Sequence, residues 1–292
     1  MGRVTTRVRR SRWNVSTGRV VERPDTIAVE EPLEIRVGTD TVTTTMRTPG
    51  DDFDLTLGHL LTEGLLHSAD EVATLMHCTD LGEDGTATFN VVDVALGPGV
   101  ALHRPLRERT EPMTSACGVC GSSSIDAVRR AGRYAVGQDP VVLSPSVVAG
   151  LPEVLRRHQP VFELTGGVHA AGLFTADGVV LSVREDVGRH NAVDKVVGAL
   201  SRERSLPFAG TVLVVSSRAS FEIIQKAAVT GIPVVVAVGA PTSLAVALAQ
   251  DSGVTLVAFT RAPLLSVYTR AGRLGPIPAS RLHPVANETP KR

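Results

Sequence analysis

The sequence contains few aromatic residues and few cysteines. Aromatic side chains make up 3% of the 292 residues, and there are only three cysteines. A core with so few rings has to be filled by Val, Leu, Ala and Ile, which suits an α/β architecture. Cysteines in a chain that shows no export signal indicate the reducing cytoplasm, where structural disulfides are rare.

Long apolar runs and an excess of charge of either sign are also missing. No run reaches the ~18 residues that a membrane helix needs, and acidic and basic residues number 30 each. This balance predicts neither a nucleic-acid partner nor a membrane partner. The pair Arg9-Arg10 resembles a twin-arginine signal, but mostly polar residues follow it. We therefore expect residues 1–18 to form a disordered basic tail and the protein to be cytoplasmic.

The length is sufficient for about two domains. Residues 19–110 combine short β-like runs with one helical pattern, which predicts a small α+β domain. The apolar positions of that helical pattern form one stripe at Phe53, Leu57, Leu60, Leu61 and Leu65. His59 lies outside the stripe and is expected at the surface. Pro98-Gly99 and the polar residues 104–112 mark the domain boundary.

Residues 111–275 alternate between strand-like and helix-like segments, and residues 276–292 are expected to be a flexible tail. Strands are predicted at 161–164, 169–174, 179–183, 211–216, 233–238 and 254–259, and helices at 123–131, 146–158, 189–204, 220–230 and 242–251. The strands at 211–216 and 233–238 are apolar on both faces, which is typical of a sheet covered on both sides. Helices between the last three strands predict parallel crossovers. The second domain is therefore predicted to be α/β.

A Cys-x-x-Cys loop is the main candidate for chemistry. Glycines flank Cys117 and Cys120, and a helical pattern begins at about Ser123. A thiol just ahead of a helix is stabilised as the thiolate by the unpaired N–H groups and the positive end of the helix dipole. Since the thiolate is the form that attacks sulfur, this loop is predicted to handle sulfur.

Three other interpretations of the motif stay open. A structural zinc site needs about four ligands, but Cys78 lies far upstream and no second paired ligand motif occurs in the sequence. A thioredoxin-like exchanger carries its motif after the first strand of a small domain, whereas this motif lies in the middle of the chain. A structural disulfide is less favoured, because nothing in the sequence indicates export.

Polar segments follow the last three predicted strands. In open α/β sheets, ligands bind at the carboxyl ends of the strands. Ser220, Thr242 and Ser243 open helices whose free N–H groups suit a phosphate. Arg218 and Arg261 are placed to pair with such an anion. The pattern favours an anionic, nucleotide-like ligand at this edge.

The densest polar cluster lies in residues 184–195. It includes Asp186, Arg189, His190, Asn191, Asp194 and Lys195. One interpretation is a solvated helix face with a salt bridge; the other is a functional cluster in which His190 tunes a cysteine or moves a proton. His169 follows two glycines that permit close approach of the backbone to a ligand. It is equally compatible with a core histidine.

Together these motifs resemble the formate dehydrogenase accessory sulfurtransferase family (FdhD). The matching segments are residues 46–52, 117–121, 165–171, 184–195, 217–222 with Lys226, and 240–246. Their order and number make the match specific. The resemblance implies a cytidine-deaminase-like three-layer α/β/α domain with a smaller N-terminal α+β roll. The zinc deaminase signature His-x-Glu followed by Pro-Cys-x-x-Cys is incomplete, so no zinc or other metal is expected.

The resemblance also implies a sulfurtransferase function. A cysteine desulfurase would load Cys117 with a persulfide, and Cys120 would help to relay or release the sulfur. The acceptor would be the molybdenum (or tungsten) cofactor of formate dehydrogenase, Mo-bis(molybdopterin guanine dinucleotide), carried as cargo. The family's cofactor-binding segment corresponds to Phe259, Thr260, Arg261, Ala262, Pro263 and Leu264. A homodimer is implied as well. The alternative function is that of a chaperone which binds the cofactor and hands it over without transferring sulfur.

Overall fold

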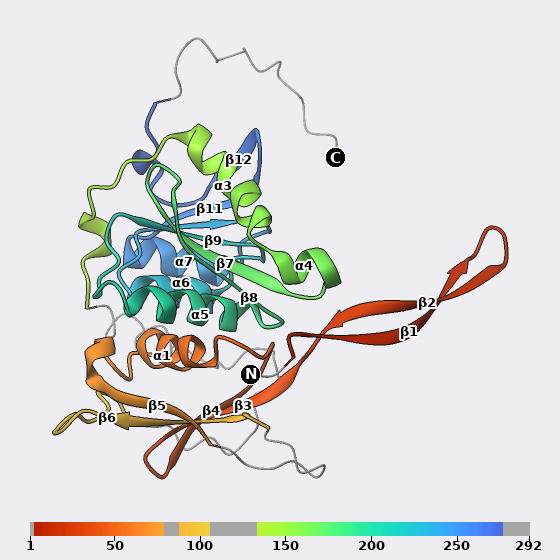
Figure 1. Ribbon diagram of the computed structural model, residues 1–292. Helices are drawn as coiled ribbons and strands as arrows, with labels where there is room; N and C mark the ends of the chain where they lie inside the picture. The colour runs from red at the N-terminus through yellow and green to blue at the C-terminus, as the bar shows by residue number, and fades with distance from the viewer. Residues whose placement is uncertain (1–2, 79–87, 106–132, 277–292) are drawn as a thin grey trace.

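Two β-sheets form the body of the protein, and a third projects from it (Figure 1). The computed structural model describes residues 3–78, 88–105 and 133–276. The expected helix at 123–131, Cys117, Cys120 and nearly all of the expected C-terminal tail lie outside the described residues. Three short 3₁₀ helices are η1 (Ala69–Glu71), η2 (Val136–Gln138) and η3 (Ala271–Arg273).

The larger sheet has six strands in the order β12-β11-β10-β9-β7-β8. The strands are β7 (His169–Thr175), β8 (Val180–Asp186), β9 (Thr211–Val215), β10 (Val234–Ala237), β11 (Thr255–Arg261) and β12 (Leu264–Val267). The central strands β9, β10 and β11 are parallel, as the sequence predicted. β7 is antiparallel to both of its neighbours, and β12 is antiparallel to β11.

Helices cover both faces of this sheet (Figure 1). They are α3 (Pro145–Arg157) on one side, and α5 (Arg189–Ser201), α6 (Phe221–Val229) and α7 (Ser243–Ser252) on the other; the short α4 (Pro160–Thr165) follows α3. Alternate residues of each central strand therefore enter different cores. Val212 and Val214 pack in the cluster with α3, whereas Leu213 and Val215 pack with α5 and α6. This explains why the strands are apolar on both faces.

The smaller N-terminal unit packs against the helices of the larger one. Its sheet consists of β3 (Glu31–Val37), β4 (Asp40–Arg47), β5 (Val72–Cys78) and β6 (Val91–Leu96), and its helix is α1 (Asp52–Thr62). α1 lies between this sheet and α5 (Figure 1). One buried apolar cluster runs from Leu33 through Leu57 to Val193. The two units thus share a core, and the predicted α/β/α domain with a smaller α+β unit is confirmed.

Glycines allow α1 and α5 to lie almost in backbone contact. A Cβ at Gly58 would lie 1.7 Å from the carbonyl oxygen of Asp194, and a Cβ at Gly198 would lie 1.9 Å from that of Asp54. No other residue type fits at either place without moving a helix.

The expected disordered tail at residues 1–18 is wrong for the part that the structure describes. β1 (Thr5–Asn14) pairs with β2 (Arg19–Ala28) along its whole length and forms an arm that leaves the body (Figure 1). Backbone hydrogen bonds and an ion pair between Arg10 and Asp25, with N···O at 2.8 Å, hold the arm together. Its side chains are mostly exposed, so no hydrophobic alternation in the sequence revealed it.

The expected strand at 161–164 is also wrong, because these residues belong to α4. Pro160 occupies the first turn, where its missing N–H costs nothing. The amides of Val161 and Phe162 both donate to the carboxylate of Glu185, each at 2.8 Å. A cap supplied from more than twenty residues away leaves no local signal in the sequence. Within the described ranges, no helix is long and apolar enough to cross a membrane.

Candidate functional site

The carboxyl ends of β9, β10 and β11 bring three polar segments together. The amide of Gly239 donates to the carbonyl of Ser217 at 3.1 Å, and the amide of Phe259 donates to the carbonyl of Gly239 at 3.2 Å. The segments after the three strands therefore adjoin at one edge, as parallel strands require. Their role in binding an anion stays a prediction.

The polar side chains at this edge differ in exposure. Arg218, Ser243 and Arg261 are exposed, whereas Ser220 and Thr242 are partly buried. The hydroxyl of Thr242 accepts a hydrogen bond from the amide of Ala245 at 3.3 Å and so caps α7. The two guanidinium groups are thus the charged groups of this set that are open to a ligand.

The segment from Phe259 to Leu264 covers the end of β11, the short connection to β12 and the first residue of β12. It includes Ala262 and Pro263, both exposed. Phe259 is 53% exposed and has a positive φ of 50°, and Leu264 is 73% exposed. Thr260 is buried, and its hydroxyl has no hydrogen-bond partner in the part of the chain that the structure describes. The turn thus presents apolar surface beside Arg261, a combination that suits a ligand with rings and phosphates.

β7 and β8 extend the same edge, because β7 is antiparallel to β9. The amide of Ser216 donates to the carbonyl of Ala170 at 3.0 Å, and His169 is paired with Asp186 across β7 and β8. His169 is partly buried; burial and the neighbouring Arg189 lower its pKa. The structure therefore places His169 at the sheet edge and not in the core.

His190 also reaches this edge from the first turn of α5. Its Nε2 lies 3.2 Å from the hydroxyl oxygen of Ser220 and 3.6 Å from Oε2 of Glu222. Burial, with the nearby cation of Lys226, lowers the pKa of His190 to about 4. The imidazole is neutral at pH 7, so one of its ring nitrogens can accept a hydrogen bond there.

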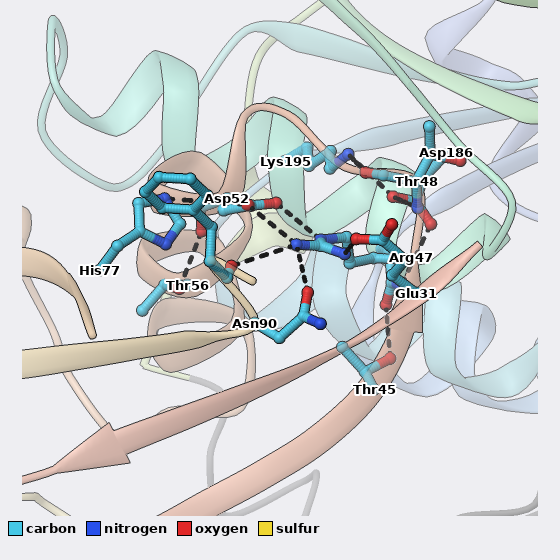
Figure 2. Close-up of polar contacts among 12 residues, drawn as sticks. Glu31, Thr45, Arg47, Thr48, Asp52, Thr56, His77, Asn90, Asp186 and Lys195 are labelled. Carbon is cyan, nitrogen blue, oxygen red and sulfur yellow. Dashed lines mark hydrogen bonds and ion pairs between the residues drawn. The ribbon is translucent and has the colours of Figure 1, made fainter. Parts of the chain in front are cut away.

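The rest of the 184–195 cluster is not on a solvated helix face, which corrects that interpretation. Lys195 is buried, and its Nζ lies 2.8 Å from Oδ2 of Asp186 and donates to the carbonyl of Thr48 at 2.9 Å (Figure 2). Burial raises the pKa of Asp186, an effect that Lys195 opposes. The side-chain amide of Asn191 donates to the carbonyl of Met46 at 2.7 Å. These contacts fasten residues 46–48 of the small unit to the start of α5.

The neighbouring Arg47 completes this junction (Figure 2). It is 1% exposed, and its guanidinium donates to both carboxylate oxygens of Asp52, at 2.9 and 3.2 Å. It also contacts Glu31 at 3.3 Å and the side chain of Asn90 at 3.2 Å. In the sequence Arg47 stands out only as part of a motif. Its role in the junction could not be predicted, because its partners Glu31 and Asn90 are remote from it along the chain.

Asp194 belongs to a second buried network between α1, α5 and α6. Its carboxylate lies 2.9 Å from Nζ of Lys226 and accepts a hydrogen bond from the hydroxyl of Thr62 at 2.7 Å. Burial alone would raise the pKa of Asp194, but Lys226 and His59 outweigh it and lower the pKa to about 2. His59 is therefore not the surface residue that the sequence suggested; its Nδ1 is 3.4 Å from Asp194.

The comparisons with known proteins agree on one family. A family model described as FdhD/NarQ matches residues 28–275. Proteins named "Sulfur carrier protein FdhD" are 52% identical in Mycolicibacterium paratuberculosis, covering 91% of this chain and 98% of the relative, and 51% identical in Streptomyces avermitilis, covering 94% and 97%. A crystal structure from Desulfotalea psychrophila, assigned as a formate dehydrogenase accessory protein, superposes with a TM-score of 0.69 at 22% identity. It covers 93% of this chain and 100% of that one.

Proposed function

This chain belongs to the FdhD/NarQ family, and we propose that it is a sulfur carrier that serves formate dehydrogenase. The observation that carries the proposal is the 52% identity, over 91% of the chain, to a protein named as a sulfur carrier. The Cys-x-x-Cys loop of this sequence supplies the sulfur chemistry that such a role needs.

The proposed chemistry is a sulfurtransferase cycle on Cys117 and Cys120. The thiolate of Cys117 attacks the terminal sulfur of a persulfide on a cysteine desulfurase. An S–S bond forms on Cys117, and the desulfurase thiolate leaves. Cys120 can then attack the inner sulfur of Cys117, which forms a Cys117–Cys120 disulfide and releases the outer sulfur as hydrosulfide. The two thiols supply the two electrons that reduce the released sulfur, and the disulfide must be reduced by an external dithiol before the next turn.

We further propose that the sheet edge holds the acceptor as cargo. A molybdenum (or tungsten) cofactor with guanine dinucleotides offers phosphates to Arg218 and Arg261, and rings to the apolar surface of Phe259 and Leu264. Neutral His190 beside Ser220 can exchange a hydrogen bond with the cargo at this edge. A homodimer, and complexes with the desulfurase and the dehydrogenase, belong to the same proposal.

Incubation with a cysteine desulfurase and cysteine is expected to add the mass of one sulfur atom to the protein, and Cys117→Ala is expected to abolish the addition. The physical reason is that the thiolate of Cys117 is the proposed acceptor of the terminal sulfur. Intact-mass measurement without reductant checks it, with Cys78→Ala as the matched control that still loads. A persulfide that persists in the Cys117→Ala protein would contradict the assignment.

Arg261→Ala is expected to weaken the binding of guanosine diphosphate by about tenfold or more, because a charge-assisted hydrogen bond contributes about 1.5–3 kcal/mol. Calorimetric titration measures the affinity. Arg157→Ala, an exposed arginine on α3, is the control and should leave the affinity unchanged. An unchanged affinity in Arg261→Ala would remove this residue from the site.

The alternative function, a chaperone that only binds the cofactor, predicts a different result for loss of the cysteines. None of the residues described at the sheet edge is a cysteine, so such a chaperone would not need them. In that case the Cys117→Ala/Cys120→Ala protein would still activate formate dehydrogenase. The sulfur-carrier proposal expects loss of activation with retained binding of guanosine diphosphate. Measuring both in one variant separates sulfur transfer from cofactor binding.

A further inference from the structure

A cluster of two histidines and one glutamate lies away from the sheet edge. His67 follows α1, Glu71 ends η1, and His103 follows β6. Potential ligand atoms of the three side chains all lie within 4.8 Å of one another. The cluster borders a cavity that Val229 also lines, at the end of α6 opposite Ser220. It is therefore separate from the site proposed for the cofactor.

The three side chains lie against one another. The imidazole rings of His67 and His103 are stacked, with centroids 3.5 Å apart and an interplanar angle of 14°. Nε2 of His103 lies 3.1 Å from each carboxylate oxygen of Glu71. Tetrahedral ligands that are each about 2.1 Å from a zinc ion are about 3.4 Å apart, so a pair separated by 4.8 Å has to close by about 1.4 Å. Side-chain rotation can supply such a change.

Backbone hydrogen bonds hold the segments that carry these side chains. The amide of His103 donates to the carbonyl of Leu65 at 3.0 Å, and the amide of Gly97 donates to the carbonyl of Glu71 at 2.9 Å. The amide of His67 donates to Oε2 of Glu71 at 3.2 Å and so orients this carboxylate. In known metal sites the ligating carboxylates are likewise oriented by a hydrogen bond from a neighbouring group.

The cavity leaves room for a further ligand. It has a volume of about 510 Å³ and is lined by His67 and His103 together with Arg104, Arg133 and Tyr134. Glu71 and His103 have side chains that are 20% and 38% exposed, so an ion can enter from solvent. Two imidazoles and one carboxylate, with a fourth position open, form a ligand set that zinc uses in proteins.

We propose that His67, Glu71 and His103 bind one zinc ion, with water or a small anion as the fourth ligand. This site contains no thiolate and is distinct from a thiol-based zinc site at the Cys-x-x-Cys loop. The sequence predicted no metal because no second pair of ligands accompanies the Cys-x-x-Cys loop and because the deaminase signature is incomplete. The spacing of His67, Glu71 and His103 along the chain matches no common zinc motif.

The test is calorimetric titration of untagged, metal-free, full-length protein with Zn²⁺. The protein carries Cys117→Ser and Cys120→Ser, so that the thiols of the loop cannot bind the ion. We expect one zinc per chain with a dissociation constant in the micromolar range or below. His67→Ala, Glu71→Gln and His103→Ala should each weaken binding at least tenfold. His158→Ala, which removes an exposed imidazole at the C-terminal end of α3, should leave it unchanged.

A second measurement guards against a variant that loses its fold. Zn²⁺ should raise the melting temperature of the parent and of His158→Ala, but not that of Glu71→Gln, whose side chain keeps its size. If zinc does not bind stoichiometrically, or if it binds with the same affinity in all three cluster variants, the proposal is wrong. In that case Glu71 and His103 form only an ion pair, and His67 stacks on the ring of His103.

Discussion

Replacing Lys226 by Met is expected to lower the free energy of unfolding by about 3–5 kcal/mol, because the substitution leaves a buried carboxylate without its counter-ion. Lys226 and Asp194 are 4% and 2% exposed, and their charged atoms lie 2.9 Å apart. The methionine fills the space of the lysine stem but offers no charge. Asp194 then has to stay ionised without compensation or take up a proton.

Urea unfolding followed by circular dichroism measures the loss of unfolding free energy. Two further variants show whether this loss comes from the buried charge. Arg10→Met breaks an exposed ion pair with Asp25 of nearly the same length, 2.8 Å, and should cost less than about 1 kcal/mol. Lys226→Met combined with Asp194→Asn removes the stranded charge and should recover part of the loss. Equal effects of Lys226→Met and Arg10→Met would show that the buried network adds nothing beyond a surface pair.

Acid should weaken the same network. The pKa of Asp194 is about 2 in the folded protein, below its ordinary value of 3.8. A lowered pKa in the folded state stabilises the protein above the unfolded value, and this stabilisation is lost as the pH falls. We therefore expect the contribution of Asp194 to disappear between about pH 4 and pH 2. Asp194→Asn should flatten this part of the profile of stability against pH.

Hydrophobic patterns predicted most of the larger unit. β9, β10 and β11 are short runs of apolar residues that alternate with helices. This pattern is typical of a parallel sheet that is covered on both faces. The polar segments after those strands followed from the same topology, since parallel strands end at one edge. For these parts of the fold and of the candidate site, the signal was contained in a few neighbouring residues.

The errors arose where the partner of a segment is remote in sequence. Asp194 and Lys195 looked like a solvated face because nothing local shows that α1 and the end of β4 cover that side of α5. The segment expected to be a disordered tail forms β1, which is stabilised by pairing with β2 and not by burial in a core. His67, Glu71 and His103 come together only because the fold places the segments after α1 and β6 side by side, and so the sequence shows no motif for them.

Gly58→Ala is expected to destabilise the protein by about 3 kcal/mol or more, since overpacking at a close helix contact forces backbone to move. The added Cβ would lie 1.7 Å from the carbonyl oxygen of Asp194, which is far inside van der Waals contact. α1 and α5 would have to separate. That separation would loosen the contacts of Lys195 with Thr48 and of Asp194 with Thr62, which also bridge the two units.

Gly150→Ala supplies the matched control because Gly150 lies inside α3 and has no atom within 4 Å of an added Cβ. Alanine is a better helix former than glycine, so this variant should gain roughly 0.5–1 kcal/mol. Thermal and urea unfolding of the two variants measure opposite signs for the same chemical change. A Gly58→Ala protein as stable as the wild type would mean that α1 and α5 do not approach so closely. A loss of stability with an altered near-ultraviolet spectrum would show that this glycine contact sets the distance between the small unit and the sheet that carries the candidate site.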